Sequence, residues 1–375
     1  NYGLGWMGQW ACSRSFGLGS RIPWDEKYLI ESLSDSTIYM AYYTIAHFLQ
    51  SNLDGSKQGL GHIEAKDMTD AVWDYIFMNG PLPETPIPQA TLDAMRQEFN
   101  YWYPFDCRVT GKDLLINHCL FSLYNHSALF PPEKFPRGIR ANGHLQINGE
   151  KMAKSTGNFF SLSDAVDQFT ADGMRIGLAD AGDGVDDANF LPATSDSGLM
   201  RLHTLLQWTK DILRLIADGK AVDRPIESFA ERVFAAQMNA AIIETQKAYA
   251  AMLFRDALRC GFYELTLARD AYISYCETAG QPLNATLLRR FIEVQAKLLY
   301  PIAPHFCDHV WRHLLGNSTF LWNERFPVAE TPDAKVLEEA RYLQKTLNRF
   351  RLAIDAYVHP KTKKGAAPVV VPEPT

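Results

Sequence analysis

Apolar residues recur at helical spacing throughout the second half of the chain. One apolar face begins with Leu202, Leu205 and Leu206 and ends before Asp218-Gly219, and later runs repeat the pattern. The repeats predict helices at 202–216, 229–242, 254–272, 285–299 and 334–358. Because no strand signal of any length interrupts them, the pattern predicts a helical bundle after about residue 195.

The first half of the chain mixes short apolar runs with turns and helices. A strand-like run at 105–110 precedes Gly111, and residues 112–129 then have helical spacing. Residues 138–147 form another strand-like run, Asn148-Gly149 is a turn signal, and a further helix opens near Ser161. The stretch 80–88 holds four prolines and predicts a stiff loop. Strand, glycine turn and helix in this order indicate an α/β fold, in which ligands bind where strand ends meet helix N-termini.

Together the two patterns predict an α/β domain followed by an all-α domain. We expect the α/β domain at 1–192, the helical bundle at 193–358 and a flexible tail at 359–375. A length of 375 residues agrees with two or three domains.

Composition and charge narrow the class of protein. The apolar fraction of 47% is typical of a globular protein. No apolar run approaches the ~20 residues that span a bilayer, so no membrane partner is expected. The 37 basic and 43 acidic residues give a net charge of −6, so a nucleic-acid partner would have to bind a local basic patch.

Three groups of residues are candidates for metal or disulfide sites. The six cysteines are scattered and fit free thiols in a reducing compartment. His305, Cys307, His309 and His313 share one helical side but do not supply the usual closed zinc set, so no zinc is predicted. The acidic cluster of Asp180, Asp183, Asp186 and Asp187 does not have the spacing of a calcium loop and fits a solvated, helix-capping loop between the domains better.

A basic stripe lies on the last predicted helix. Arg341, Lys345 and Arg349 recur at i, i+4 and i+8, and the segment 333–364 holds eight Lys and Arg against four Asp and Glu. This net charge of +4 contrasts with the −6 of the whole chain. The stripe fits either a solvated helix face with ion pairs or a face that binds phosphates.

The most informative loop follows Asn148-Gly149. Lys151 and Lys154 lie three residues apart in it, and glycines flank them. Flexible ammonium groups of this kind can converge on a polyanion. Nucleotidyl transfer needs them because charge accumulates on the phosphate oxygens in the transition state. On chemistry alone, an ordinary solvated loop explains the same residues equally well.

The loop resembles a family signature, and so do other segments of the chain. Lys151-Met152-Ala153-Lys154-Ser155 resembles the lysine loop of class I aminoacyl-tRNA synthetases, Lys-Met-Ser-Lys-Ser, with Ala153 in place of the first serine. The segments 10–14, 17–19, 23–26, 29–39, 111–114, 117–118, 171–175 and 187–190 resemble leucyl-tRNA synthetases of the eukaryotic and archaeal type. The similarity runs in order from about residue 6 to residue 358, and the run at 31–39 is the part that indicates leucine.

The resemblance implies roles for individual residues. Lys151 and Lys154 would be catalytic and would stabilise the triphosphate, with Mg²⁺, while the leucine carboxylate attacks the α-phosphorus. The implied ATP-binding residues are Gly111, Asp113, His118, Gly143, His144, Leu145, Lys151, Lys154 and Ser155; the implied leucine-binding residues are Ser36, Tyr39 and His118; the implied tRNA-binding residues are Arg341, Lys345 and Arg349. Simpler explanations exist for three of them. Asp113 suits the first turn of any helix, because an acidic side chain there is favoured by the helix dipole. His118 fits ordinary packing of a lone histidine on a helix, and Tyr39 fits an aromatic core stripe.

The resemblance also implies parts that this chain does not contain. It has no His-x-Gly-His signature, no editing domain and no large C-terminal extension, and it begins at Asn1. We therefore expect part of a longer cytosolic member of this family, namely the second half of a Rossmann-like catalytic fold followed by the helical bundle. Its partners would be ATP, leucine, tRNA(Leu) and the missing N-terminal half with the editing domain.

Two alternatives stay open at this point. One is a non-catalytic relative that binds tRNA or senses leucine, and the other is a class I synthetase for another aliphatic amino acid. On the preferred interpretation, we expect this chain alone to be catalytically weak or inactive, because half of the ATP site would lie elsewhere.

Overall fold

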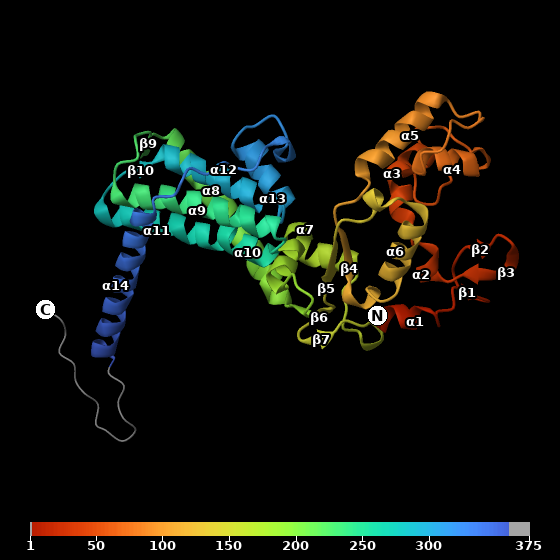
Figure 1. Cartoon of the computed structure of the whole chain (residues 1–375). Helices are drawn as coiled ribbons and strands as arrows, with labels where there is room; N and C mark the ends of the chain where they lie inside the picture. The colour runs from red at the N-terminus through yellow and green to blue at the C-terminus, as the bar shows by residue number, and fades with distance from the viewer. Residues whose placement is uncertain (1, 360–375) are drawn as a thin grey trace, which may run out of the picture. The chain divides into compact units, whose positions relative to one another are not determined.

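The computed structural model describes residues 2–359, which divide into two compact units (Figure 1). The first unit comprises the chain up to His144 together with Gly184–Asp187; the second comprises Leu145–Asp183 and the chain from Ala188 onward. Apart from His359, the flexible tail expected at 359–375 lies outside the described residues. No helix in the described part of the chain is long and apolar enough to cross a membrane.

The first unit combines short helices with two small sheets. One sheet is antiparallel with the strand order β1-β3-β2, and the other is a parallel pair of β4 and β5. Its elements are α1 (Tyr2–Met7), β1 (Ser13–Arg14), β2 (Arg21–Ile22), β3 (Asp25–Ile30), α2 (Ser32–Asp35), α3 (Tyr39–Leu49), η1 (Ala65–Asp67), α4 (Asp70–Phe77), α5 (Gln89–Trp102), β4 (Arg108–Gly111), η2 (Lys112–Leu114), α6 (His118–Leu129), η3 (Pro132–Lys134) and β5 (Ile139–Asn142).

Helices α3, α4 and α5 form the main core of the first unit. Ile45, Val72, Ile76, Leu92 and Met95 are almost completely buried where these helices meet. Burial of each such side chain stabilises the fold by about 1.5–3 kcal/mol. The proline-rich stretch between α4 and α5 contains neither helix nor strand, so the prediction of a loop at 80–88 is confirmed.

The second unit begins with a three-stranded sheet and continues as a helical bundle. β6 pairs with β7 in the antiparallel sense and with β8 in the parallel sense. Its elements are β6 (Leu145–Ile147), β7 (Glu150–Lys151), η4 (Lys154–Thr156), α7 (Leu162–Ala181), β8 (Ala188–Phe190), α8 (Pro192–Ala217), β9 (Ala221–Val222), α9 (Phe229–Ala250), α10 (Phe254–Leu258), η5 (Arg259–Glu264), α11 (Leu265–Ala279), β10 (Leu283–Asn284), α12 (Ala285–Leu299), α13 (Pro304–His309), η6 (Val310–Leu314), η7 (Leu321–Asn323) and α14 (Ala334–Val358).

The core of the bundle confirms the predicted helical periodicity. Phe234 of α9 stacks on Tyr272 of α11 at 5.0 Å between ring centroids and also contacts Phe291 of α12. α12 and α14 have the bounds that the sequence pattern predicts. Within the described residues, the bundle departs from an all-helical pattern only at β9 and β10, which form a two-residue parallel pair.

Two predictions in the first half need correction. The strand predicted at 138–147 is wrong as one strand, because β5 ends at Asn142 and β6 begins at Leu145. β5 pairs with β4, whereas β6 pairs with β7 and β8. The helix predicted at 112–129 is also two elements. η2 ends at Leu114, and α6 begins only at His118, where the Asn117 side chain accepts a hydrogen bond from the His118 backbone N–H.

Candidate functional site

The parallel pair β4 and β5 brings several predicted residues to one edge of the first unit. Gly111 at the end of β4 lies opposite Asn142 at the end of β5. Parallel strands end at the same edge, so Asp113 and His144 both follow the carboxyl edge where ligands bind in open α/β sheets. Their side chains approach each other, with His144 Nε2 3.5 Å from Asp113 Oδ1.

Asp187 organises this edge, although the sequence pattern did not identify it as a site residue. Its Oδ1 atom accepts hydrogen bonds from Lys112 Nζ at 2.6 Å and from the backbone N–H of His144 at 2.8 Å. The bond from the Lys112 ammonium, assisted by that from His144, lowers the pKa of the Asp187 carboxyl. The spacing of the acidic cluster does not distinguish Asp187 from the other three aspartates, and the family-like segment 187–190 contains it without implying a role for it.

One glycine at this edge has no room for a side chain. A Cβ atom on Gly143 would lie 2.1 Å from the backbone oxygen of Asp186, which explains why glycine occupies this position. A Cβ atom on Gly111 would lie 2.6 Å from Asp113 Oδ1, but that carboxylate can rotate away.

A second cluster of predicted residues surrounds His118 at the start of α6. Its Nε2 atom lies 3.1 Å from Ser36 Oγ, and its ring lies 6.2 Å from that of Tyr39. On the other side, a terminal nitrogen of Arg108 contacts His118 Nδ1. His118 is only 5% exposed. Burial lowers its pKa, and the nearby Arg108 charge lowers it further, so the imidazole is held in its neutral form.

The position of Ser36 is set by the helix that precedes it. Glu31 caps the four-residue helix α2 by accepting hydrogen bonds from the backbone N–H groups of Leu33 and Ser34. Glu31 is itself held by Arg14 at 2.6 Å and by Trp10 Nε1 at 3.1 Å. The segment around 10–14 therefore supports the Ser36 side of the cluster through one partly buried carboxylate.

The lysine loop lies in the second unit and is closed by its own backbone. Asn148 and Gly149 both have positive φ angles, 53° and 81°, as a tight two-residue hairpin between β6 and β7 requires. The backbone N–H of Ala153 donates to Asn158 O at 3.0 Å. The Asn158 side-chain amide donates to the carbonyl of Lys151 at 3.3 Å.

The two lysines of this loop are exposed and available to a ligand. Lys151 ends β7, Lys154 begins η4, and neither forms an ion pair within the described residues. Ser155 is also exposed in η4, and Leu145 begins β6. Ala153 joins the loop hydrogen bonds through its backbone, so the serine hydroxyl that it replaces is not needed for these loop contacts.

The predicted nucleotide residues are therefore divided between the two units. Gly111, Asp113, His118, Gly143 and His144 belong to the first unit, whereas Leu145, Lys151, Lys154 and Ser155 belong to the second. Within the first unit, the structure brings Asp113 close to His144, and separately brings His118 close to Ser36 and Tyr39.

The basic stripe on α14 is accessible along its length. Arg341, Lys345 and Arg349 are exposed, and none of them forms an ion pair in the part of the chain that the structure describes. The Arg341 side chain donates only to the carbonyl of Leu337, one turn earlier. A solvated helix face with ion pairs was one explanation of the stripe, but these three side chains form no such pairs within the described residues.

The residues considered for zinc have other partners. His305 Nδ1 lies 3.0 Å from Asp172 Oδ1, and Cys307 is completely buried. Among residues 2–359, no three potential metal ligands gather into one group.

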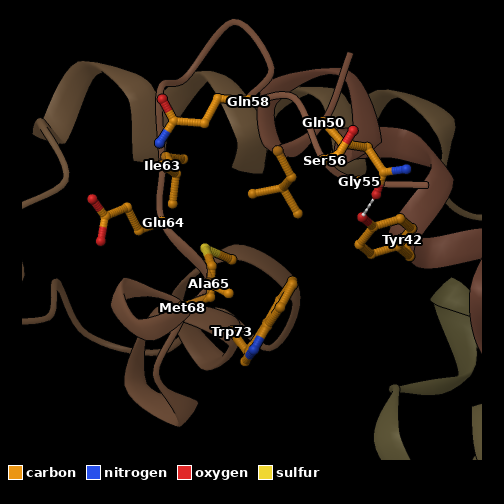
Figure 2. A pocket seen from close by; sticks show the side chains of 11 residues that line it. Tyr42, Gln50, Gly55, Ser56, Gln58, Ile63, Glu64, Ala65, Met68 and Trp73 are labelled. Atoms are coloured by element: carbon orange, nitrogen blue, oxygen red, sulfur yellow. Dashed lines mark hydrogen bonds between the residues drawn. The ribbon is translucent and has the colours of Figure 1, made fainter. Parts of the chain in front are cut away.

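A hollow of about 500 Å³ lies elsewhere in the first unit, beside α3 and α4 (Figure 2). Tyr42, Met68 and Trp73 contribute to its lining, and the Tyr42 hydroxyl donates a hydrogen bond to Gln50. None of the sequence-predicted site residues lines this hollow.

Known protein families match both halves of the chain. Residues 69–196 match the family described as tRNA synthetases class I (M), and residues 231–360 match the anticodon-binding domain of tRNA ligase. These matches confirm the predicted fold class of a Rossmann-like catalytic region followed by a helical domain.

Similar whole proteins extend the match across nearly the entire chain. The cytoplasmic leucine–tRNA ligase of Pongo abelii is 47% identical over 96% of this chain and 30% of its own length. That of Dictyostelium discoideum is 47% identical over 99% of this chain and 34% of its own length. The chain thus spans about a third of the length of these relatives.

One solved structure resembles the chain in fold. It is the LeuRS of Agrobacterium radiobacter K84 in a ternary complex with tRNA and LeuAMS. The TM-score is 0.51 at 20% sequence identity, and the likeness covers 72% of this chain and 33% of the solved one.

Proposed function

The chain belongs to the leucine–tRNA ligase family of the class I synthetases, and from this we propose that it forms part of an enzyme that joins leucine to tRNA(Leu). The enzyme would first form leucyl-adenylate from leucine and ATP and then transfer the leucyl group to the tRNA. The observation that carries this proposal is the identity of 47% over 99% of the chain to a leucine–tRNA ligase. The solved neighbour in complex with tRNA and LeuAMS supports the same ligand classes.

In this reaction, Lys151 and Lys154 would bind the triphosphate. As the leucine carboxylate attacks the α-phosphorus, charge shifts onto the departing pyrophosphate oxygens, and a nearby ammonium group stabilises that charge. Both lysines are exposed and free of ion pairs within the described residues, so neither has to break an internal contact before it binds. Ser155, beside them in η4, would donate its hydroxyl to the same phosphates.

The strand edge of the first unit would bind the nucleoside. Asp113 is an acceptor for the ribose hydroxyls, and Gly111 lets the backbone approach the nucleotide. Gly143, His144 and Leu145 would contact adenine through their backbone. The hydrogen bond from the His144 N–H to Asp187 fixes the course of this segment, which supports the assignment.

Ser36, Tyr39 and His118 would contact leucine, and His118 would also face the adenylate. Their support is the packing of the three side chains around one buried imidazole. A neutral imidazole suits a pocket for an apolar side chain because it carries no charge that would have to be desolvated.

Mg²⁺ would act with the triphosphate. Mg²⁺ keeps several of its waters and binds through substrate phosphates with one or two carboxylates rather than in an all-protein cage. When bound, the ion supplies neutralisation of phosphate charge.

The proposal also covers the domain boundary of this chain, the cellular compartment of the enzyme and the remaining parts that it would need. We place the domain boundary near residue 192, close to the end of the first family match at residue 196 and well before the second match begins at residue 231. We place the enzyme in the cytoplasm because its relatives are cytoplasmic ligases. The chain alone would be weakly active or inactive, and its partner in catalysis would be the N-terminal half with the editing domain.

The test of this function is amino-acid-dependent exchange between ATP and pyrophosphate. The full-length protein that contains this chain would be assayed with leucine, isoleucine, valine and methionine in parallel, and the chain alone beside it. Exchange with leucine only in the longer protein supports the proposal. Exchange with another amino acid, or none from a folded full-length protein, refutes it, and comparable rates from the chain alone refute the expected inactivity.

The α14 stripe predicts a salt-dependent contribution to tRNA binding. Replacement of Arg341, Lys345 and Arg349 by alanine should weaken binding of tRNA at low salt. The slope of log affinity against log salt concentration should fall in magnitude by about 2–3, because each lost phosphate contact removes ~0.7–0.9. Titration of labelled tRNA at several salt concentrations measures the slope.

A matched control for the stripe comes from the same unit. Lys210, Arg214 and Lys247 are exposed on α8 and α9, and their triple alanine variant should keep the wild-type slope. An equal loss in both triple variants would show that α14 contributes only general positive charge.

A further inference from the structure

His118 is held between two elements by partners of different chemistry. Ser36 follows α2 and approaches His118 Nε2 at 3.1 Å, whereas Arg108 lies on β4 and contacts His118 Nδ1. Because the imidazole is almost fully buried, water does not compete for either nitrogen. Each ring nitrogen therefore has one protein partner.

The identity of these partners determines where the proton lies. A guanidinium group has only N–H donors, so His118 Nδ1 must be the unprotonated, accepting nitrogen. The neutral ring then carries its proton on Nε2 and donates it to Ser36 Oγ. A serine that accepts through its oxygen keeps its own hydrogen free. The exposed Ser36 hydroxyl can therefore donate that hydrogen outward, to an acceptor on a ligand.

The charge of Arg108 is not neutralised locally. It forms no ion pair with a carboxylate among the described residues, and its second terminal nitrogen is buried without a hydrogen-bond partner. Its positive charge therefore polarises the imidazole and, through it, the Ser36 hydroxyl, as in other buried hydrogen-bond chains. This makes the hydroxyl a better donor to an oxygen that carries negative charge.

The other groups that face His118 do not supply an opposing anion at either nitrogen. They are Glu31 ahead of α2, Ser36 after α2 and Tyr39 at the start of α3. The Glu31 carboxylate is already bound by Arg14 and Trp10 and by the backbone of α2. Arg108 is thus the charged group in direct contact with the imidazole.

We propose that Arg108 is a positioning residue that fixes His118 as the Nε2-protonated tautomer and thereby makes the Ser36 hydroxyl a donor to a carboxylate or acyl oxygen of the bound amino acid. The identity of that ligand as leucine rests on the proposed function. The tautomer and the direction of the hydrogen bonds rest on the contacts alone. The lowered pKa of His118 agrees with this arrangement.

The first test reads the tautomer in the chain itself and needs no activity. In the ¹⁵N NMR spectrum of histidine-labelled protein, assigned with His118→Asn, Nδ1 should appear unprotonated and Nε2 protonated. This pattern should persist as the pH falls through ~6.5, where an ordinary histidine titrates. Arg108→Gln should populate both tautomers and raise the pKa of His118 only part of the way to its ordinary value, because burial, the larger cause of the lowering, remains, whereas Arg108→Lys should retain the wild-type tautomer.

Arg137→Gln is the matched control, because Arg137 is an exposed arginine of the same unit whose one ion pair among residues 2–359 is with Asp106. It should leave the His118 signals unchanged. A wild-type His118 that is protonated on Nδ1, or that titrates as an ordinary histidine, overturns the proposal. So does an Arg108→Gln protein with unchanged His118 signals.

The second test uses the full-length enzyme in the exchange assay. Arg108→Gln should raise the KM for leucine by about 3–10-fold, the scale of one hydrogen bond, with little change in the KM for ATP. The increase should grow modestly as the pH falls from 7.5 to 6, because removal of the Arg108 charge raises the pKa of the still-buried His118 and allows a fraction of it to be protonated, whereas the wild-type KM should stay flat. Arg108→Lys should restore the flat profile.

A double-mutant cycle with Ser36→Ala separates this role from a purely structural one. If Arg108 and Ser36 act through the same hydrogen-bond chain, the effects of Arg108→Gln and Ser36→Ala on the KM for leucine should not add. Full additivity, or a folded Arg108→Gln enzyme with wild-type KM and pH profile, overturns the proposal. If the enzyme does not use leucine at all, the proposed function fails, and the NMR result still decides the role of Arg108.

Discussion

Lys154→Ala in the full-length enzyme is expected to lower the rate of leucine-dependent ATP–pyrophosphate exchange by about 10²–10³-fold, the scale of one lost charge-stabilising contact. The Lys154 ammonium would interact most strongly with the phosphate oxygens in the transition state, where negative charge accumulates. We therefore expect kcat to fall much more than the KM for ATP rises. Steady-state exchange at varied ATP concentration measures both.

In this structure, Lys154→Ala removes a positive charge without removing a contact that holds the loop. Lys154 begins η4, and its backbone carbonyl, not its side chain, accepts the bond from Gly157 that closes the short helix. Asn158 supports the loop through backbone carbonyls of β6 and β7. The alanine variant should thus keep the loop conformation. Lys210→Ala, which removes an exposed lysine of α8, is the control and should leave the rate unchanged. A near-normal rate for Lys154→Ala would exclude the proposed role.

Helix boundaries could be predicted where the signals that set them are local. α12 begins after Asn284, whose side chain accepts a hydrogen bond from the Leu287 N–H. α14 begins after Asp333, which accepts from Lys335 and Val336. Both capping residues lie within three positions of the groups that they bind, so the sequence alone contains this information.

The break between β5 and β6 could not be predicted because its causes are distant in sequence. An apolar run identifies a strand but not its partner, and β5 and β6 join different sheets. The break at Gly143 lies against the backbone of Asp186, whose oxygen would be only 2.1 Å from a Cβ atom on Gly143. Forty-three residues separate His144 from Asp187, the residue that binds its N–H.

The candidate site shows the same division between local and distant information. The lysine loop is a short segment with a recognisable order of residues, so the sequence alone predicts it. Arg108 carried only a weak signal, a charge within a short strand-like run, and its contact with His118 becomes visible only in the fold. The hollow beside α3 and α4 does not point to the candidate site either, because neither the two lysines of the loop nor Arg108 and His118 line it (Figure 2).

The largest expected effect on stability concerns Glu231, which is completely buried in the bundle. Its carboxylate accepts hydrogen bonds from the backbone N–H groups of Glu227 and Ser228 at 3.0 and 2.9 Å and from the Asn284 side chain at 3.1 Å. It also pairs with Arg224 at 2.8 Å. One side chain therefore completes the capping box of α9 and joins it to the start of α12.

Glu231→Ala is expected to lower the free energy of unfolding of the bundle by about 3–5 kcal/mol, because it leaves a partly buried Arg224 and several donors without their acceptor. Burial raises the pKa of Glu231, but the hydrogen bonds from Ser228 and Glu227 outweigh it, and the net shift is downward. A depressed pKa stabilises the fold above the unfolded value of about 4.3 and loses that contribution as the pH falls through the folded value. The difference between wild type and variant should thus shrink in acid.

Urea unfolding followed by tryptophan fluorescence measures this effect, because Trp208 and Trp311 report on the bundle core. Glu244→Ala is the matched control on the same helix. Glu244 is exposed, and its pair with Lys247 spans three residues on the surface, so the change should stay within about 0.5 kcal/mol. A loss of unfolding free energy for Glu231→Ala no larger than that of the control would contradict the prediction. It would mean that the hydrogen bonds of the buried carboxylate only compensate for the cost of its desolvation and add no net stability.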